Sequence, residues 1–463
     1  MNPVAVSKGA QSVNASGVNA AARLDRLPMT SFQRNMFIII ALAWLFDSID
    51  LGMMTFLLAP VREHFGLTAA TAGIVASSSF VGMFVGAALA GMLGDKFGRK
   101  IIFQWSIIIW SVGSIICALS PNVAFFIVLR FVIGFGMGAE FPIAQSMLSE
   151  LIPSSHRGRY LALLEGFWPL GFICAGIIAW LILPIGGWRW VLVAGGIPGL
   201  YILWIRRKLP ESARWYEIKG RYEEAEAVVS MFEKKVREIT GKPLPPVKPN
   251  VETVSSEGSS LIDSFRMLWQ GMYIKRTLMV WVLWFFYLFG YYGITTWVSA
   301  LMVDKGYSIT SSTAYTILIS LGAIPGFALA AYLVDKWGRK PTLVTYIAGA
   351  AVTAYFYGAT VDFTTMIAWG LAMQFFLFGT WSCLYAYTPE LYPTRARATG
   401  CGFASAIGRL GSLLAPTIAG ILMGISSTLN VFSLGVIAFI IAILGVLILG
   451  PETKGMSLEE ISQ

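Results

Sequence analysis

Two acidic side chains, Asp47 and Asp50, stand inside a long apolar stretch of the chain, residues 35–59. Their three-residue spacing places both on one face of a helix, about 4.5 Å apart along its axis. A charged side chain at the centre of a bilayer costs about 2.5–3.5 kcal/mol, so the pair requires a function or a partner. Two carboxylates this close in a low dielectric resist being ionised together, and such a pair can take up and release a proton. The alternative is that they pair with a nearby Arg or backbone group and hold helices together.

Arg409 is the only cation deep inside the apolar runs of the second half of the chain. Its guanidinium stays charged and can bind a carboxylate through two parallel hydrogen bonds. It therefore suits the anionic group of a ligand. The alternative is a structural ion pair with Glu140, Asp47 or Asp50.

Two glutamates also lie in apolar runs, and either could relay protons. Glu140 stands two residues before Pro142, a residue that kinks helices. Glu165 lies near the cytoplasmic end of its run, where it fits better into a cluster of charges at the helix ends.

Aromatic side chains recur at helical spacing and form stripes on the faces of several predicted helices. Such faces can stack on a flat aromatic ring, with Tyr hydroxyls and the Gln374 amide supplying hydrogen bonds. Helix packing and anchoring at the bilayer surface is the competing interpretation for each single residue. The candidates for substrate binding are Trp168, Trp284, Tyr287, Tyr291, Tyr292, Gln374, Trp381 and Tyr385, together with Asp47, Asp50 and Arg409.

The elements that must position these residues are membrane spans. Of the 463 residues, 56% are hydrophobic and 13% are charged, whereas a soluble domain has about 25% charged residues. A helix needs about 20 apolar residues to cross a bilayer. We predict twelve transmembrane helices, at 35–59, 69–93, 101–119, 123–147, 160–183, 187–205, 277–302, 312–334, 341–360, 364–387, 398–423 and 429–449.

The net charge of +9 could suggest a nucleic-acid partner, but the basic residues are not distributed for one. They gather in alternate loops, as in Lys96–Lys100, Arg206–Lys208 and Lys336–Lys340, while the opposite loops hold few. This positive-inside asymmetry indicates a multi-pass protein with both termini in the cytoplasm. We expect the lipid bilayer as a partner and no nucleic acid.

The two halves of the chain repeat each other, which predicts two similar six-helix bundles. The repeated segments keep one register, so that Asp95 corresponds to Asp335 and Arg99 to Arg339. They are Gly91–Lys100 with Ala331–Lys340, Glu150–Pro153 with Glu390–Pro393, and Pro210–Ser212 with Pro451–Thr453.

The repeat also divides the chain into parts. We expect amphipathic helices at the cytoplasmic face in the central linker, where charged and apolar residues alternate at helical spacing. The parts are a flexible cytoplasmic N-terminal tail (1–30), an N-terminal six-helix bundle (31–206), a cytoplasmic linker (207–272), a C-terminal six-helix bundle (273–450) and a short cytoplasmic C-terminal tail (451–463).

The repeated charged residues lie at the predicted cytoplasmic ends of the helices. If they form charge-assisted pairs, they latch these ends while the carrier faces outward and must separate when it opens inward. The residues assigned to this cytoplasmic gate are Asp95, Arg99, Glu150, Arg157, Glu165, Asp335, Arg339, Glu390 and Arg397.

These repeated loops resemble the signature of the major facilitator superfamily. The pattern Asp-Lys-x-Gly-Arg-Lys occurs at residues 95–100 and 335–340, and the span-four pattern begins at Arg130. Segments 210–212 and 451–455 look like the half-ending motifs of its sugar-porter branch. In such a motif, Arg130 would organise helices or a proton relay, so the proton-coupling candidates are Asp47, Asp50, Glu140 and Arg130.

Finer features resemble the bacterial niacin transporters, over nearly the whole chain after residue 30. They are segments 44–50, 140–142, 164–168, 291–293, 385–393 and 408–411. The neighbouring aromatic-acid proton symporters share the first of these elements. The Gln-Gln pair of sugar porters in span seven is absent, which makes a sugar a poorer substrate.

The resemblance implies a secondary active transporter in the cytoplasmic (inner) membrane. By alternating access it would import nicotinate, nicotinamide or a related aromatic acid with protons, acting as a monomer. The rivals are a benzoate-type symporter, a sugar or drug facilitator and a non-transporting sensor. The residues themselves predict no enzyme, no cofactor and no metal site, because no nucleophile–base set, metal cluster or phosphate-binding loop occurs.

Overall fold

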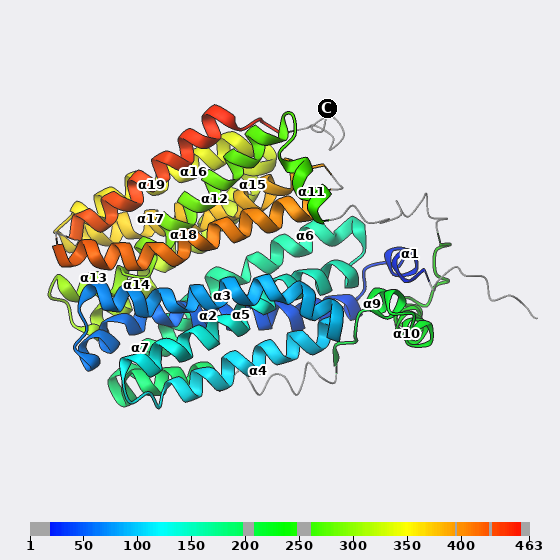
Figure 1. Ribbon diagram of the computed structural model, residues 1–463, viewed down its shortest axis with the longest axis horizontal. Coiled ribbons are helices and arrows are strands. Elements are labelled where there is room, and N and C mark those ends of the chain that lie inside the picture. Colours follow the sequence, from blue (N-terminus) through cyan, green and yellow to red (C-terminus); the bar gives the residue numbers. More distant parts are fainter. Residues whose placement is uncertain (1–18, 198–207, 248–260, 394–395, 426–427, 455–463) are drawn as a thin grey trace, which may run out of the picture.

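The computed structural model describes residues 19–197, 208–247, 261–393, 396–425 and 428–454. The chain forms two helical bundles that lie side by side, the first half blue to cyan and the second green to red (Figure 1). The first contains α2 (Ser31–Phe65), α3 (Ala69–Phe97), α4 (Arg99–Cys117), α5 (Val123–Leu151), α6 (Ser154–Glu165) and α7 (Phe167–Gly196). The second contains α12 (Tyr273–Thr295), α13 (Val298–Asp304), α14 (Ile309–Ser320), α15 (Ala323–Lys336), α16 (Arg339–Ala359), α17 (Phe363–Glu390), α18 (Arg397–Ile425) and α19 (Thr428–Leu449).

The helices confirm the predicted all-α membrane fold with two six-helix halves. In the described residues, 11 stretches are long and apolar enough to cross a membrane. One of them, Ser155–Gly196, joins the fifth predicted span to the start of the sixth. The two are divided at Gly187, whose φ of 68° breaks the helix, and the sixth predicted span continues beyond Ile197, outside the described residues.

The outward faces of the bundles are apolar. Large hydrophobic side chains such as Trp105, Val128 and Ile448 are more than half exposed. A soluble monomer rarely exposes apolar surface on this scale, but a lipid-facing helix must. The exposed belt is therefore the membrane-facing surface of a multi-pass membrane protein.

One end of the molecule, which we call the linker end, carries three short helices (Figure 1). They are α1 (Ala20–Asp25), α9 (Ala213–Ile218) and α10 (Tyr222–Thr240), and α1 packs against both of the others. Arg23 of α1 donates hydrogen bonds to Glu226 at 2.5 and 2.9 Å and to Glu233 at 3.0 Å. The stretch expected to be a flexible tail thus contains, in its described part, a helix fixed by buried and half-buried charges.

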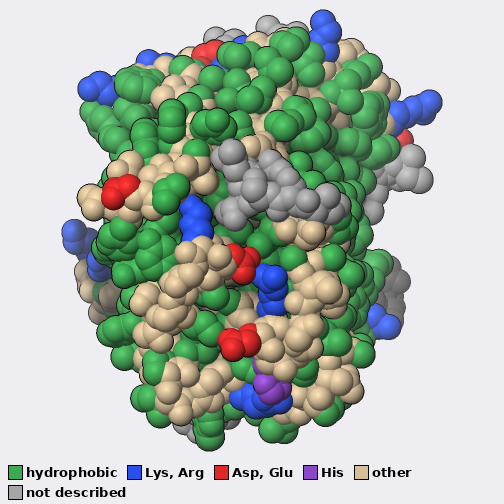
Figure 2. Space-filling view, turned by 90° about the vertical axis from the view of Figure 1, so that its left-hand side faces the viewer, with side chains coloured by type: hydrophobic (Ala, Val, Ile, Leu, Met, Phe, Trp, Pro, Cys, Tyr) green, Lys and Arg blue, Asp and Glu red, His purple; other side chains and the backbone are tan. Residues whose placement is uncertain are grey.

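The two halves meet at the opposite end, which we call the far end. There α3 packs against α18, α7 against α14 and α2 against α13. Arg62 and Asp304 form an ion pair between the halves at 3.2 Å, and the hydroxyls of Ser77 and Thr417 lie 2.8 Å apart. Figure 2 looks onto this end and shows charged and polar side chains in its middle between hydrophobic flanks.

Close contact at the far end depends on small residues. A Cβ atom added to Gly73 of α3 would lie 2.5 Å from the carbonyl oxygen of Pro416 in α18. Only glycine permits this approach of two backbones. The contacts join the far ends of the two bundles in the state described.

Candidate functional site

The two acids of α2 are both fully buried, but they face different partners. Asp50 Oδ2 lies 3.4 Å from Arg130 Nη1 of α5, and Asp50 Oδ1 accepts a hydrogen bond from Ser114 Oγ of α4 at 3.2 Å. The Asp47 carboxyl group instead has Glu140 of α5 as its acidic neighbour, and neither of its oxygens has a hydrogen-bond partner among the described residues. The shared helix face expected from the spacing therefore serves two separate charge groups.

Asp47 and Glu140 are neighbouring acids, and both are fully buried. Both oxygens of Asp47 and Glu140 Oε1 lack a hydrogen-bond partner among the described residues. Glu140 Oε2 accepts hydrogen bonds from Trp110 Nε1 at 3.0 Å and Ser106 Oγ at 3.3 Å. Two neighbouring buried carboxylates resist being ionised together, so this pair is a candidate site for a proton.

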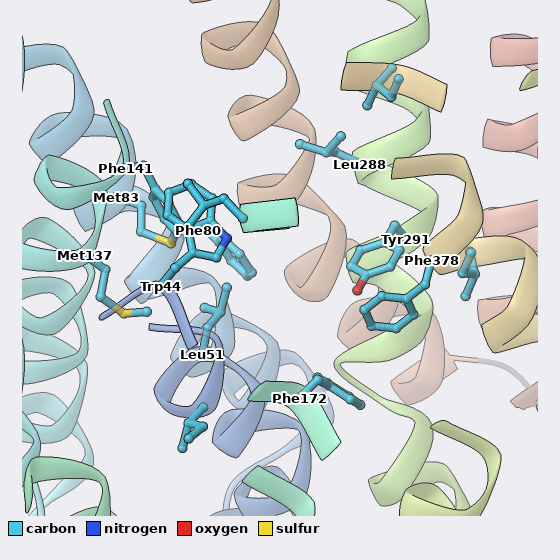
Figure 3. Close-up of a cluster of buried hydrophobic side chains, with 14 of the residues drawn as sticks. Trp44, Leu51, Phe80, Met83, Met137, Phe141, Phe172, Leu288, Tyr291 and Phe378 are labelled. Carbon is cyan, nitrogen blue, oxygen red and sulfur yellow. The ribbon is translucent and has the colours of Figure 1, made fainter. Parts of the chain in front are cut away.

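A small cavity lies between the halves. Aromatic side chains form part of its wall, with hydroxyl groups among them, and Arg130 is the only charged side chain among the described residues that line it. Figure 3 shows Trp44 and Phe80 of one half facing Tyr291 and Phe378 of the other. The lining residues are Ser48, Leu51, Gly52, Met54, Thr55, Ala76, Phe80, Arg130, Trp168, Phe172, Tyr291, Tyr292, Thr295 and Thr296.

Two ring contacts cross this cavity between the halves. The rings of Phe80 and Tyr292 are 4.6 Å apart, and those of Phe172 and Phe378 are 6.0 Å apart. The structure thus brings the predicted residues Trp168, Tyr291 and Tyr292 to the cavity wall. It also brings there Phe172, which stands at helical spacing from Trp168 in one of the aromatic stripes, and adds Phe80, which the spacing analysis did not select because a single Phe residue on a helix looks like ordinary packing.

Arg409 of α18 lies at the interface of the halves. Its guanidinium carbon stands 5.1 Å above the ring of Phe141 in α5, and Tyr292 and Tyr385 are near it. In the described part of the chain it forms no ion pair, so the alternative of a structural pair with Glu140, Asp47 or Asp50 is not what the structure contains. A half-buried guanidinium without a counter-ion is a ready binding group for a carboxylate.

The remaining predicted aromatic residues divide into two groups. Trp284 Nε1 donates to Thr388 Oγ1 at 2.9 Å, and Tyr287 donates to the Leu377 carbonyl at 2.5 Å. These two bonds lie within the second half, away from the cavity lining, and hold its helices together. Tyr385 and Trp381 are half-buried and their rings stack 5.8 Å apart, on the same helix as the fully buried Gln374.

Several of these groups have unused hydrogen-bonding atoms. Trp381 Nε1 and both polar atoms of the Gln374 side chain lack a partner among the described residues. Gln374 does not line the cavity between the halves. Trp381, which contacts the cavity residue Tyr291 at 5.4 Å between ring centres, is closer to it.

The charged residues assigned to the gate pair within each half. Arg99 pairs with Glu150, and Arg339 contacts Glu390 at 2.9 Å and Asp335 at 3.5 Å. The other gate candidates have separate contacts. The backbone carbonyl of Asp95 accepts a hydrogen bond from Trp215, and Arg157 lies 4.0 Å from Asp25. Glu165 accepts a hydrogen bond from Gln145 at 3.2 Å, and Arg397 donates one to the Pro389 carbonyl at 3.0 Å.

Two glutamates that we did not predict as site residues organise these gates. The Glu211 carboxylate accepts from the backbone N–H groups of Arg99 and Lys100 at the first turn of α4, at 3.0 and 3.1 Å. Glu452 does the same for the first turn of α16, at 3.0 and 3.1 Å. Both belong to the repeated Pro-Glu-Ser/Thr segments, which was the signal available in the sequence.

Comparison with known proteins gives one consistent answer. The chain is 36% identical to the niacin transporter NiaP of Acinetobacter baylyi, over 96% of this chain and 100% of that one. It is 35% identical to a putative niacin/nicotinamide transporter of Bacillus subtilis, over 92% and 98% of the two chains. A structure of the xylose transporter XylE from E. coli superposes with a TM-score of 0.73 at 19% identity, covering 92% of this chain and 100% of that one.

The family match extends over residues 35–463, which include both bundles, the linker between them and the cavity at their interface. The relatives named above are transporters, and the twelve-span architecture is the one that their fold requires. The chain therefore belongs to the family described as "Sugar (and other) transporter", and it is a membrane transporter of the major facilitator fold.

Proposed function

We propose that this protein imports niacin, as nicotinate or nicotinamide, or a closely related small aromatic acid. The observation that carries the proposal is the guanidinium of Arg409, which forms no ion pair with any described residue and lies at an aromatic interface between the halves. Nicotinate is a planar ring with one carboxylate, so it needs one cation and flat apolar walls. The two niacin-transporting relatives support the same substrate class.

In this proposal the aromatic residues grip the ring while Arg409 binds the carboxylate. Trp168, Tyr291 and Tyr292 line the cavity, and Trp381 and Tyr385 extend the aromatic surface beside Arg409. The free indole N–H of Trp381 is a donor for the ring nitrogen or the amide oxygen of the substrate. Trp284, Tyr287 and Gln374 act indirectly, by supporting this surface from within the second half.

Import is coupled to protons through the buried acids of α2. Asp47 and Glu140 share an exchangeable proton, and Asp50 has Arg130 as a counter-ion that it can release when protonated. Because all four groups lie near the interface of the halves, their protonation can bias which end opens.

We place the linker end in the cytoplasm, with both termini there, in a bacterial inner membrane. The basic loops favour this orientation. Since the far ends of the halves are joined by Arg62–Asp304 and by α3–α18 packing, this is a state closed to the outside. In the outward-facing state, the charged groups of the Arg99–Glu150 pair would form ion pairs with those of the Arg339–Glu390 pair in the other half. The protein needs no partner subunit for this cycle, and we expect a monomer.

The test is uptake of labelled nicotinate into cells or proteoliposomes by the wild type and Arg409→Gln. We expect a loss of at least about tenfold in the apparent affinity for nicotinate and little change for the neutral nicotinamide. Arg237→Gln on the exposed face of α10 is the matched control. Undiminished nicotinate uptake by Arg409→Gln contradicts the proposed site. Stronger competition by hydroxybenzoate than by nicotinamide assigns the protein to the benzoate-type carriers instead.

A further inference from the structure

Arg130 has more hydrogen-bonding capacity than its surroundings use. The side chain is 0% exposed, yet its one described hydrogen bond joins Nη1 to Asp50 Oδ2 at the long distance of 3.4 Å. Nε and Nη2 are buried and have no partner among the described residues. A buried guanidinium with two unused donors is strongly unfavourable unless a ligand or water completes it.

Arg130 belongs to the wall of the small cavity between the halves. No other charged side chain of the described lining competes for an anion there. Thr55 and Thr295 add hydroxyls, and Trp168 and Phe172 provide flat apolar walls. A planar aromatic ring with one carboxylate matches this combination of a cation, hydroxyls and ring faces.

The Asp50 carboxyl group has a second neighbour besides Arg130, so its ion pair with Arg130 can break without a large movement of Asp50. The Ser114 hydroxyl of α4 lies 3.2 Å from Asp50 Oδ1 and 2.9 Å from the Leu192 carbonyl oxygen of α7, and it can donate its one proton to either. This hydroxyl remains beside Asp50 when Arg130 is released. The other titratable groups around Arg130 and Asp50 are Asp47 of α2, Glu140 of α5 and Cys117 of α4.

We propose that Arg130 is a second carboxylate-binding group on the transport path, and that ionised Asp50 and the carboxylate of the substrate compete for its guanidinium. This proposal rests on the proposed function, because it assumes an aromatic carboxylate as substrate. When Asp50 takes up a proton, Arg130 is free to bind the anion, so one proton and one carboxylate load together. Arg409 then receives the carboxylate from Arg130 as the substrate moves through the interface.

The competition is tested by measuring the affinity of purified protein for nicotinate and for nicotinamide, by titration calorimetry at pH 6 and pH 8. The two ligands have the same ring, and only nicotinate has the negative charge. In the wild type, nicotinate should bind more weakly at pH 8, where Asp50 is ionised more often. In Asp50→Asn the competing charge is gone, so nicotinate should bind about tenfold tighter than to the wild type at pH 8. Its pH dependence should be largely lost, while nicotinamide changes by less than about twofold.

Arg130→Gln gives the second arm. We expect it to lose the preference for nicotinate by about tenfold or more while it keeps nicotinamide binding, which also reports that the variant is folded. If Arg130→Gln does not fold, the isosteric Asp50→Asn variant alone decides. Equal effects of Asp50→Asn on both ligands, or an unchanged pH dependence for nicotinate, overturn the proposal.

The result separates this proposal from the proposed function. A wild type that binds neither ligand refutes the substrate class itself. Loss of nicotinate binding in Arg409→Gln, with Asp50→Asn indistinguishable from the wild type, leaves the proposed function in place and removes only the role of Arg130.

Discussion

Replacing Glu211 by Gln should destabilise the protein more than the same change at Glu452. Both carboxylates receive backbone N–H groups from the first turn of a helix, but Glu211 is only 8% exposed whereas Glu452 is largely exposed. Hydrogen bonds to a charged group contribute about 1.5–3 kcal/mol each when buried, and a negative charge at a helix N-terminus adds about 0.3–1 kcal/mol.

In either Glu→Gln variant, the side-chain amide keeps one acceptor oxygen, but it has no charge and places an NH2 group opposite backbone N–H donors. From these terms we expect Glu211→Gln to cost about 2–3 kcal/mol, and Glu452→Gln no more than about 1 kcal/mol because solvent screens it. The assay is thermal unfolding in detergent, where 1 kcal/mol corresponds to about 2–4 °C in proteins of moderate size. Glu238→Gln on the surface of α10 is the control; it removes only an exposed ion pair with Lys235, which contributes no more than about 1 kcal/mol, and should shift Tm less than Glu211→Gln. An equal or larger shift for Glu452→Gln would refute the reasoning.

Three further predictions concern the ends of the molecule and one close helix contact. Hydrogen bonds from Arg23 lower the pKa of Glu226. At Glu233 burial raises the pKa, but the hydrogen bonds from Arg23 and Arg26 outweigh burial and the pKa is lowered. The helix α1 should therefore stay docked above the ordinary Glu pKa and detach as the pH falls through the lowered values; hydrogen exchange of residues 19–27 at pH 7 and at about pH 2.5 measures this, and equal protection after correction for intrinsic exchange rates contradicts it. Arg62→Glu should increase the open population of the far end a few-fold, since an exposed ion pair contributes about 0.2–1 kcal/mol. Adding Asp304→Arg to the same chain should restore closure. The rate at which an outside reagent labels a cysteine placed at Thr55, on the cavity wall, measures how often the far end opens. Gly411→Ala should lower both Tm and the transport rate, because its methyl group would clash with the Phe285 carbonyl and push α18 away from α12 at a cost of about 1–3 kcal/mol. Gly424→Ala in the same helix is the control: no described atom lies within 4 Å of the added methyl group, so Tm and transport should not change.

The fold could be predicted from the sequence because its strongest signals are local or repeated. Apolar runs long enough to cross a bilayer require no knowledge of neighbours. The correspondence of Asp95 and Arg99 with Asp335 and Arg339 placed the halves in register, and both Arg residues do pair with a Glu of their own half. The short helix α1 was missed because six residues carry no hydrophobic period that could be told from a loop.

The partners of the candidate residues could not be predicted from the sequence, because helix rotation and tertiary packing determine them. Asp47 and Asp50 share a helix face, yet neighbouring helices present a carboxyl group to one and a guanidinium to the other. Nothing in the spacing of α2 records which residue of α5 lies opposite. In the same way the sequence marks Arg130 as a costly buried charge, but only the structure places it on the cavity wall with two donors unused.

The charges at the centre of the interface lead to a last prediction about coupling. In the proposed mechanism, Asp47 and Glu140 share one proton and carry a single negative charge, Asp50 carries another, and Arg130 and Arg409 are positive, so the charges of these five groups would sum to zero before substrate arrives. Glu165 lies nearer the linker end, beside Gln145. Adding a carboxylate leaves a net negative charge in a low dielectric, which is unfavourable unless one proton enters as well. Nicotinate uptake should therefore be driven by a pH gradient and be insensitive to membrane potential, whereas nicotinamide, which brings no charge, should not need the gradient to bind. Proteoliposomes in which a potassium diffusion potential changes the rate of nicotinate uptake at constant pH would show that the central charges are not balanced in this way.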